Sequence, residues 1–196
     1  MGWDPRSRGA VMSVNLRSRR TEIVPMRLAD IDEVLDIERH SFRAPWPRQV
    51  FLEELEREWA HLDVVKEKPA GAARACVVAF CNYWLVRDEV HILNLATHPE
   101  HRRKGHAARL LQAVIDFARR HGCRYVTLEV RRSNAGAIKL YRSYGFRPIG
   151  IRPNYYVEDN EDAVVMLLDL DPSASACPTR APAAATRSPA RSAATC

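Results

Sequence analysis

The stretch that most constrains the fold is Thr97–Leu111, THPEHRRKGHAARLL, which leads from the end of an apolar strand through a basic turn into a helix. The helix, from Gly105 to His121, presents one apolar stripe, and Gly122 is a typical stop at its end. A further strand, Arg124–Val130, follows directly. A strand–helix–strand succession predicts two parallel strands joined by a crossover helix. The chain is therefore expected to fold as an α/β protein with a mixed sheet.

Hydrophobic periodicity places further elements on both sides of this unit. Asp30 opens the first helix, where Asp30 and Glu33 resemble a capping box. The last two strands are joined by a polar, aromatic loop, Pro153–Asp162. The expected order is β-α-α-β-β-β-α-β-α-β-β. The expected strands are Glu22–Arg27, Leu62–Lys66, Ala75–Val86, Val90–Thr97, Arg124–Val130, Phe146–Arg152 and Ala163–Leu170, and the expected helices are Asp30–Glu38, Pro47–Trp59, Gly105–His121 and Ser133–Tyr144.

The net charge is concentrated at the two ends of the chain. The formal charge of +6 over 196 residues is carried by residues 1–20, with five Arg and one Asp, and by residues 171–196, with three Arg and one Asp. Residues 21–170 are therefore neutral in sum, and a basic nucleic-acid-binding face is not expected on them. We expect residues 21–170 to form one domain, residues 1–20 a disordered basic arm, and residues 171–196 a disordered tail rich in Ala, Pro, Ser and Arg.

The composition does not favour a disulfide-bonded, metal-binding or membrane-spanning protein. The five cysteines are odd in number and form no C-x-x-C pair, which predicts buried free thiols in a reducing cytosol. His98, His101 and His106 form a cluster, but without H-E-x-x-H or paired cysteines no metal site is expected. No apolar run is long enough to span a bilayer, and the N-terminus has no apolar signal core, so a cytoplasmic protein is expected.

The basic turn has the chemistry of a phosphate site. The first N–H groups of a helix lack partners inside it, and the helix dipole favours an anion there. Gly105 and the small Ala107 and Ala108 would let a phosphate approach the backbone, directly behind the cations at 102–104. The same residues also fit an ordinary solvated basic turn, since R-x-x-G-x-A alone is a weak pattern. The strand before the turn and the helix after it favour the phosphate site.

Residues Arg102–Ala107 (RRKGHA) resemble the Q/R-x-x-G-x-G/A signature of the GNAT superfamily of N-acetyltransferases, which binds the pyrophosphate of acetyl-CoA. The resemblance covers residues 22–170 and implies a GNAT fold with acetyl-CoA as co-substrate and no metal. Further motifs resemble the RimI branch, which acetylates the N-terminal alanine of a small-subunit ribosomal protein: Asn94–Thr97 (NLAT), Leu128–Arg131 (LEVR), Ser133-Asn134, Ala137–Tyr141 (AIKLY), Gly145-Phe146 and Asn154–Tyr156 (NYY).

The resemblance also implies which residues hold the co-substrate. Backbone groups of Leu95, Ala96 and Thr97 are expected to hold the pantetheine arm and polarise the thioester carbonyl. Asn134 is expected to contact CoA, although on the sequence alone it is equally a helix cap. The N–H groups expected to hold the pyrophosphate are those of Arg103, Lys104, Gly105, His106, Ala107 and Ala108.

Two residues match the family's proton carriers. Acetyl transfer requires that the ammonium lose a proton and that the departing thiolate gain one. Glu129 matches the general base, acting through water, and partial desolvation in its apolar strand is expected to raise its pKa. The alternative is a carboxylate paired with Arg124 or Arg131. Tyr141 matches the proton donor to the thiolate, and its alternative is a tyrosine that packs with its hydroxyl at the edge.

Two aromatic loops match those that flank the peptide groove in this family. Phe42 and Trp46 lie in the first loop and Tyr155 and Tyr156 in the second, where their rings and hydroxyls are expected to hold the acceptor peptide. The alternative is an aromatic lid that packs on itself. The chain departs from the family at Pro153, where an arginine often precedes N-Y-Y.

The expected protein is an acetyl-CoA-dependent N-acetyltransferase that works by direct transfer in a ternary complex, because no cysteine matches a catalytic position. The expected partner is a protein N-terminus, that of a ribosomal protein. We expect a monomer without membrane contact, and contact with nucleic acid only through the basic arm. Two alternatives stay open: a GNAT enzyme acting on a lysine side chain or a small-molecule amine, and a non-catalytic acyl-CoA-binding or ribosome-associated module.

Overall fold

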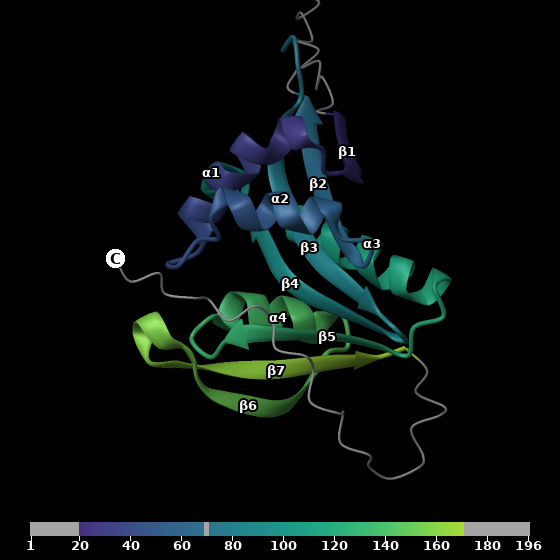
Figure 1. Cartoon of the computed structure of the whole chain (residues 1–196), viewed down its shortest axis with the longest axis vertical. Coiled ribbons are helices and arrows are strands. Elements are labelled where there is room, and N and C mark those ends of the chain that lie inside the picture. The colour runs from purple at the N-terminus through teal and green to yellow at the C-terminus, as the bar shows by residue number, and fades with distance from the viewer. Residues whose placement is uncertain (1–19, 69–70, 171–196) are drawn as a thin grey trace, which may run out of the picture.

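The computed structural model describes residues 20–68 and 71–170, and it confirms the expected order of strands and helices (Figure 1). The expected arm and tail lie outside these residues, apart from the first residue of β1. The strands are β1 (Arg20–Pro25), β2 (Ala60–Lys68), β3 (Cys76–Val86), β4 (Glu89–Thr97), β5 (Tyr125–Arg131), β6 (Arg147–Tyr156) and β7 (Glu161–Asp169). The helices are α1 (Ile31–Ser41), α2 (Arg48–Glu56), α3 (His106–Arg120) and α4 (Ala135–Ser143), with short 3-10 turns at Leu28–Asp30, Pro99–His101 and Val157–Asp159.

The strands form a single sheet in the order β1-β2-β3-β4-β5-β7-β6. β4 and β5 pair in parallel through the crossover helix α3, as predicted, and the other neighbours are antiparallel. The parallel ladder is short, because it begins at Glu89 opposite Tyr125 and ends at Ile92 opposite Leu128, whereas β4 continues to Thr97. Beyond that point β4 and β5 diverge, so the sheet opens between two halves, β1–β4 and β5–β7 (Figure 1).

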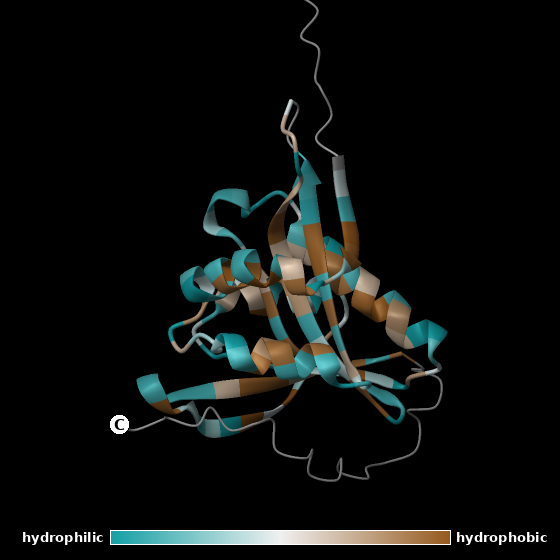
Figure 2. Cartoon of the chain, turned by 45° about the horizontal axis from the view of Figure 1, so that its top comes forward, coloured by the Kyte–Doolittle hydropathy of each residue, from teal (hydrophilic) through white to brown (hydrophobic). Residues whose placement is uncertain are grey.

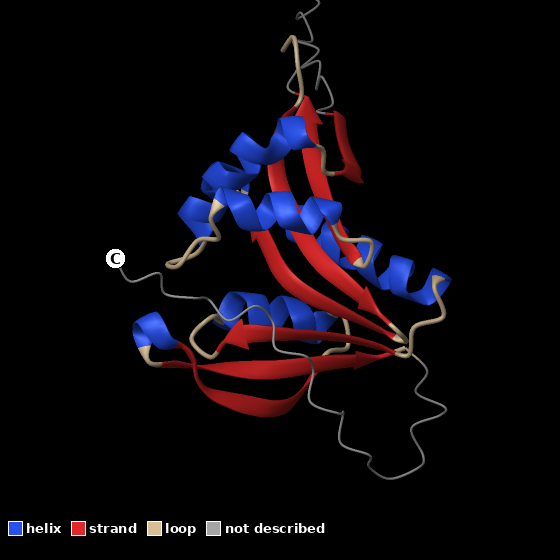
Figure 3. Cartoon of the chain, in the orientation of Figure 1, coloured by secondary structure: helices blue, strands red, loops and turns tan. Residues whose placement is uncertain are grey.

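Helices cover both faces of the sheet (Figure 3). On one face, Leu110 and Val114 of α3 and Tyr141 of α4 join the larger core cluster with inner residues of β3, β4 and β5. On the other face, Ile37 of α1 and Phe51 of α2 form a second cluster. β3 lies between the two clusters and has seven consecutive buried residues. Hydrophobic residues accordingly recur along the central strands (Figure 2).

The capping box expected at the start of α1 is wrong. The carboxylate of Asp30 accepts the backbone N–H of Arg27 at 3.0 Å and pairs with Lys66 at 2.7 Å, so it closes the turn before α1. Glu33 reaches across to β3, where it accepts the backbone N–H of Val77 at 2.6 Å. Asp30 caps the preceding turn instead of α1, and Glu33 bonds a strand distant in the sequence, which is why the sequence pattern failed here.

The loop expected over Pro153–Asp162 is shorter in the structure, because β6 continues to Tyr156. The pairing of β6 with β7 skips from Arg152 to Tyr156, and Asn154 inside this irregularity has a φ of 49°. Proline and asparagine favour loops, but an edge strand can accommodate them in a bulge. The aromatic residues that follow are therefore held by the sheet.

The described cysteines are free thiols. Cys81 and Cys123 are buried, as expected, but Cys76 is exposed because it is the first residue of β3 and lies beyond the covered part of the sheet. Across the part of the chain that the structure describes, no helix combines the length and the apolar character needed to cross a bilayer.

Candidate active site

The divergence of β4 and β5 exposes one edge of β4. The ladder to β5 ends at Ile92, while β3 still pairs with β4 as far as Thr97. A bulge at Leu93 falls at this point. Among the described residues no strand pairs with the β5 side of Leu95, Ala96 and Thr97, so their backbone groups can bind a ligand that runs along β4 like an added strand.

α3 begins at the open end of this edge. Gly105 is its N-cap residue with a φ of 82°, and Arg103 has a φ of 63°, so the basic turn coils tightly into the helix. No side chain caps the helix, and its first backbone bond runs from the N–H of Arg109 to the carbonyl of Gly105 at 3.0 Å. The N–H groups of residues 106–108 therefore have no helical partner. This arrangement suits an anion.

The turn before α3 is held by its own cations. Arg102 donates to the carbonyl of Thr97 at 3.2 Å, and the Lys104 ammonium donates to the carbonyl of Glu100 at 3.1 Å. A Cβ at Gly105 would meet no atom within 4 Å, so the space at the helix start is open. Positive charge, unpaired N–H groups and open space coincide, which fits a diphosphate.

Two expected co-substrate residues have further structural roles. The side-chain oxygen of Asn134 accepts the N–H of Ala137 at 3.1 Å, so Asn134 does cap α4, and its contact with CoA stays a prediction. The His106 side chain is buried and faces Glu67 of β2 at 3.5 Å. The backbone N–H of His106, rather than its ring, therefore belongs to the helix start.

Glu129 lies on β5 just beyond the last β4–β5 pair and is 6% exposed. One carboxylate oxygen is 2.8 Å from Nε2 of His91, and the other forms an ion pair with Arg152 at 3.0 Å without an aligned hydrogen bond. Burial raises the pKa of Glu129, whereas the hydrogen bond from His91 and the charges of His91 and Arg152 lower it. The lowering effects together are larger, so the pKa lies below 4.5. The expected upward shift is wrong, and the pairing alternative holds with partners other than Arg124 and Arg131.

His91 extends this pair into a chain of three groups. It lies on β4 opposite Thr127 of β5, and its Nδ1 is 2.9 Å from the Thr127 hydroxyl oxygen. Glu129 is two residues further along β5, on the same face as Thr127. The imidazole thus bridges a hydroxyl and a carboxylate across the two parallel strands and fixes Glu129 where they separate.

Tyr141 reaches the opening from the opposite face. Its ring packs in the larger core, 5.7 Å from that of Phe146. Burial raises the pKa of Tyr141 well above its usual range, and interaction with Cys81 of β3 and Tyr156 of β6 raises it further. Cys81 lies on β3 and Tyr156 on β6, so the phenol has neighbours in both parts of the sheet. It is protonated at neutral pH and can act as a proton donor.

Comparison with known proteins identifies the family of this chain. The model of the Acetyltransferase (GNAT) family matches residues 31–146. The chain belongs to the GNAT acetyltransferase family. It is 38% identical over 147 residues to the "Putative [ribosomal protein bS18]-alanine N-acetyltransferase" of Bacillus subtilis (strain 168), which covers 74% of this chain and 93% of that relative.

Two further comparisons concern Escherichia coli. The chain is 31% identical over 150 residues to the [ribosomal protein bS18]-alanine N-acetyltransferase of strain K12, covering 76% of this chain and 97% of that relative. The crystal structure of the ribosomal-protein-S18-alanine N-acetyltransferase from Escherichia coli matches with a TM-score of 0.66 and 32% identity, covering 76% of this chain and 94% of that one. The expected GNAT fold and acetyl-CoA-dependent N-acetyltransferase activity are therefore confirmed.

In this GNAT acetyltransferase the two loops expected to flank the acceptor are tied together. Arg43, between α1 and α2, donates to the carboxylate of Asp159, between β6 and β7, at 2.6 Å. Arg131 of β5 donates to the other oxygen of the same carboxylate at 2.5 Å. A pocket of about 520 Å³ lies here, lined by Arg43, Ser133 and Asp159 among others. The ion pairs therefore set the distance between the loops.

The four aromatic residues expected on the acceptor side differ in their environment. Phe42 and Trp46 are partly buried against the second core cluster, so they pack on the core and not on each other as a lid. Tyr155 and Tyr156 meet edge to face with ring centroids 5.1 Å apart, and the guanidinium of Arg131 covers the Tyr156 ring at 3.9 Å. Contact of these four residues with a peptide stays a prediction.

Sequence reasoning missed the residues that hold Glu129. His91 carried a signal, because it is polar in an otherwise apolar strand and alternation places it level with Thr127. Arg152 carried no such signal, since it lies on β6, which β7 separates from β5 in the sheet. Each half of the site was predicted from local motifs, but the pairing across strands was not.

Proposed function

We propose that this acetyltransferase acetylates the N-terminal alanine of a cytoplasmic small-subunit ribosomal protein of the bS18 type. The names of the relatives support this acceptor, and the likeness extends over three quarters of the chain. The observation that carries the proposal is the ionised carboxylate of Glu129, fixed by His91 where β4 and β5 diverge.

The lowered pKa of Glu129 favours an α-amine over a lysine side chain. An α-amine with a pKa near 7.7–8.0 is neutral in about one molecule in ten at pH 7, whereas a lysine amine is neutral in about one in 2,500. A carboxylate with a pKa below 4.5 is a weak base, and it suffices where little proton removal is required. The ionised Glu129 can also attract the ammonium group into the site before the proton is lost.

The residues at the opening fit acetyl-CoA. This co-substrate supplies an acetyl group activated as a thioester. The free β4 edge at residues 95–97 would hold its extended arm, and the N–H groups of residues 106–108 would hold its diphosphate behind Arg102 and Lys104. A backbone donor aimed at the carbonyl oxygen stabilises the charge that develops there, by a few kcal/mol. Tyr141, protonated and buried, would return a proton to the departing thiolate.

Two matched peptides test the acceptor. The first begins with the alanine-initiated N-terminus of bS18 and has each lysine replaced by arginine. The second has the same sequence with a propionyl-blocked N-terminus and one lysine. With the full chain and acetyl-CoA, we expect the mass of one acetyl group on the first peptide and none on the second. Acetylation of the second peptide alone would assign the enzyme to lysine instead.

A further inference from the structure

Three side chains with metal-binding atoms meet beneath the start of α3. Glu67 comes from β2, His101 from the 3-10 turn after β4, and His106 from the first turn of α3. One carboxylate oxygen of Glu67 is 3.8 Å from Nδ1 of His101, and the other is 3.5 Å from Nε2 of His106. One ligand atom from each residue lies within 4.8 Å of the others.

This cluster is buried and incompletely hydrogen-bonded. Glu67 and His106 are 3% and 4% exposed, and His101 is 24% exposed. Both ring nitrogens of His106 and the Nδ1 of His101 lack a hydrogen-bond partner among the described residues. Buried polar groups are nearly always paired, so imidazole nitrogens left this way indicate a ligand or a structural cost.

The surroundings of both imidazoles favour the protonation state that binds metals. Burial lowers the pKa of His101 and of His106, and the carboxylate of Glu67 only partly opposes this. The nearby charges of Lys104 and Arg109 lower the two values further. Metals bind the neutral form of imidazole through its lone pair, so these surroundings are compatible with coordination.

We propose that Glu67, His101 and His106 form a binding site for a divalent transition-metal ion of the Zn²⁺ class. Bonds of about 2.0–2.1 Å in a tetrahedral site place neighbouring ligand atoms about 3.4 Å apart. The Glu67 carboxylate lies 3.8 Å from Nδ1 of His101 through one oxygen and 3.5 Å from Nε2 of His106 through the other, so all three side chains are near that spacing. Two nitrogens and one carboxylate favour Zn²⁺ or Co²⁺ over Mg²⁺ or Ca²⁺. No metal site was expected from the sequence, which has no H-E-x-x-H and no paired cysteines, and Glu67 lies far from both histidines in the chain.

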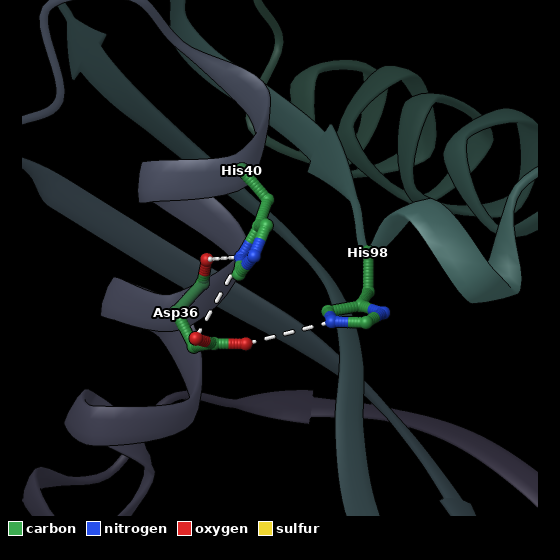
Figure 4. A group of neighbouring side chains, drawn as sticks. All are labelled: Asp36, His40 and His98. Atoms are coloured by element: carbon green, nitrogen blue, oxygen red, sulfur yellow. Dashed lines mark hydrogen bonds and ion pairs between the residues drawn. The ribbon is translucent and has the colours of Figure 1, made fainter.

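A neighbouring cluster of similar composition lacks these properties. Asp36, His40 and His98 meet near the surface (Figure 4). The Nδ1 of His40 donates to the Asp36 carbonyl at 2.8 Å, and the Nδ1 of His98 accepts the N–H of Glu100 at 3.4 Å. His40 and Asp36 are about half exposed. Because His40 and Asp36 are solvated and the Nδ1 atoms of both histidines already have hydrogen-bond partners, this second cluster provides the control for the buried one.

Metal binding would brace the phosphate-binding turn. His101 and His106 flank residues 102–105, and Glu67 anchors them to the sheet. A bound ion would therefore fix both ends of the turn that the proposed function assigns to the diphosphate. The metal test does not depend on that assignment, since it measures the ion alone.

The test titrates the full chain with CoCl₂, followed by absorption spectroscopy, and then displaces Co²⁺ with ZnCl₂. We expect one equivalent of Co²⁺ with the intense bands of a four-coordinate site and without thiolate charge-transfer bands. His101→Gln and His106→Gln should each weaken binding at least about tenfold, because each removes a direct ligand. His40→Gln should leave the affinity unchanged.

Three results would overturn the proposal. The first is unchanged Co²⁺ affinity in both His101→Gln and His106→Gln. The second is loss of binding in His40→Gln, and the third is a spectrum with thiolate bands, which would assign the metal to cysteine. Circular dichroism of each variant shows whether it is folded, and the more exposed His101 keeps the test valid if His106→Gln does not fold.

Discussion

At the scale of single residues, opposing effects on one carboxylate decide how Glu129 can act. Burial alone would raise its pKa and favour the protonated form. The hydrogen bond from His91 and the charge of Arg152 outweigh burial, so the group stays ionised. Because the folded-state pKa lies below the ordinary value of 4.5, these contacts stabilise the fold above that pH, and the contribution is lost as the pH falls through the folded-state pKa.

Glu129→Gln should show whether this carboxylate takes part in acetyl transfer. The substitution keeps the shape of the side chain but removes the charge proposed to attract and deprotonate the amine, so kcat should fall by about 10²–10⁴. Acetyl-CoA affinity, measured by calorimetry, should change little, because Glu129 lies outside residues 95–97 and 106–108. Glu22→Gln, at an exposed position on β1, is the control. Unchanged turnover in Glu129→Gln would remove Glu129 from the mechanism.

His91→Leu should shift the pH dependence of the reaction. Removing the imidazole leaves Glu129 buried but without its hydrogen bond, so the pKa of Glu129 should rise. The acidic limb of the kcat/KM profile should therefore move to higher pH. Thr127→Val is the matched control, because it removes the other partner of His91 and leaves the contact between His91 and Glu129 in place. Equal profiles for His91→Leu and the unaltered protein would contradict this positioning role.

At the scale of elements, local patterns predicted what they specify directly. The apolar stripe from Leu110 to Ala118 predicted α3, and Gly122, whose φ is 67°, predicted its end. The patterns failed where a tertiary contact replaced a local one, as at Glu33, which bonds β3 instead of capping α1. The length of the β4–β5 ladder was equally beyond prediction, because divergence depends on how two halves of a sheet pack and not on either strand's sequence.

The two ends of α3 offer a matched pair of glycines. Gly105 and Gly122 both have positive φ, and a Cβ at either would meet no atom within 4 Å. Alanine at either position should therefore destabilise the fold by about 1–2 kcal/mol through backbone strain. Gly105→Ala should also weaken acetyl-CoA binding about tenfold. Its Cβ would enter the open space proposed for the diphosphate, and displacing one charge-assisted hydrogen bond there has roughly that effect. Calorimetry showing equal acetyl-CoA affinity in both variants would exclude α3's start as the diphosphate site.

At the scale of the whole molecule, the candidate site lies where the two halves of the sheet separate. β1–β4 with α1 and α2 provide the free strand edge and the first aromatic loop, and β5–β7 provide Glu129 and the second loop. The ion pair between Arg43 and Asp159 joins the two halves, and Arg131 of β5 holds the same Asp159 carboxylate from within its own half. Such long-range pairs leave no trace in sequence periodicity, which is why the motifs identified both loops but not their connection.

The ion pair between Arg43 and Asp159 should therefore affect acceptor binding more than stability. Arg43 is largely exposed, and exposed pairs contribute at most about 1 kcal/mol, so Arg43→Gln should leave the melting temperature nearly unchanged. Loosening the two loops should raise KM for the alanine peptide up to about fivefold without changing kcat. Arg48→Gln is the control, because Arg48 pairs with Asp32 on the surface without joining the loops. An equal KM in both variants would show that the loops position the peptide independently of this pair.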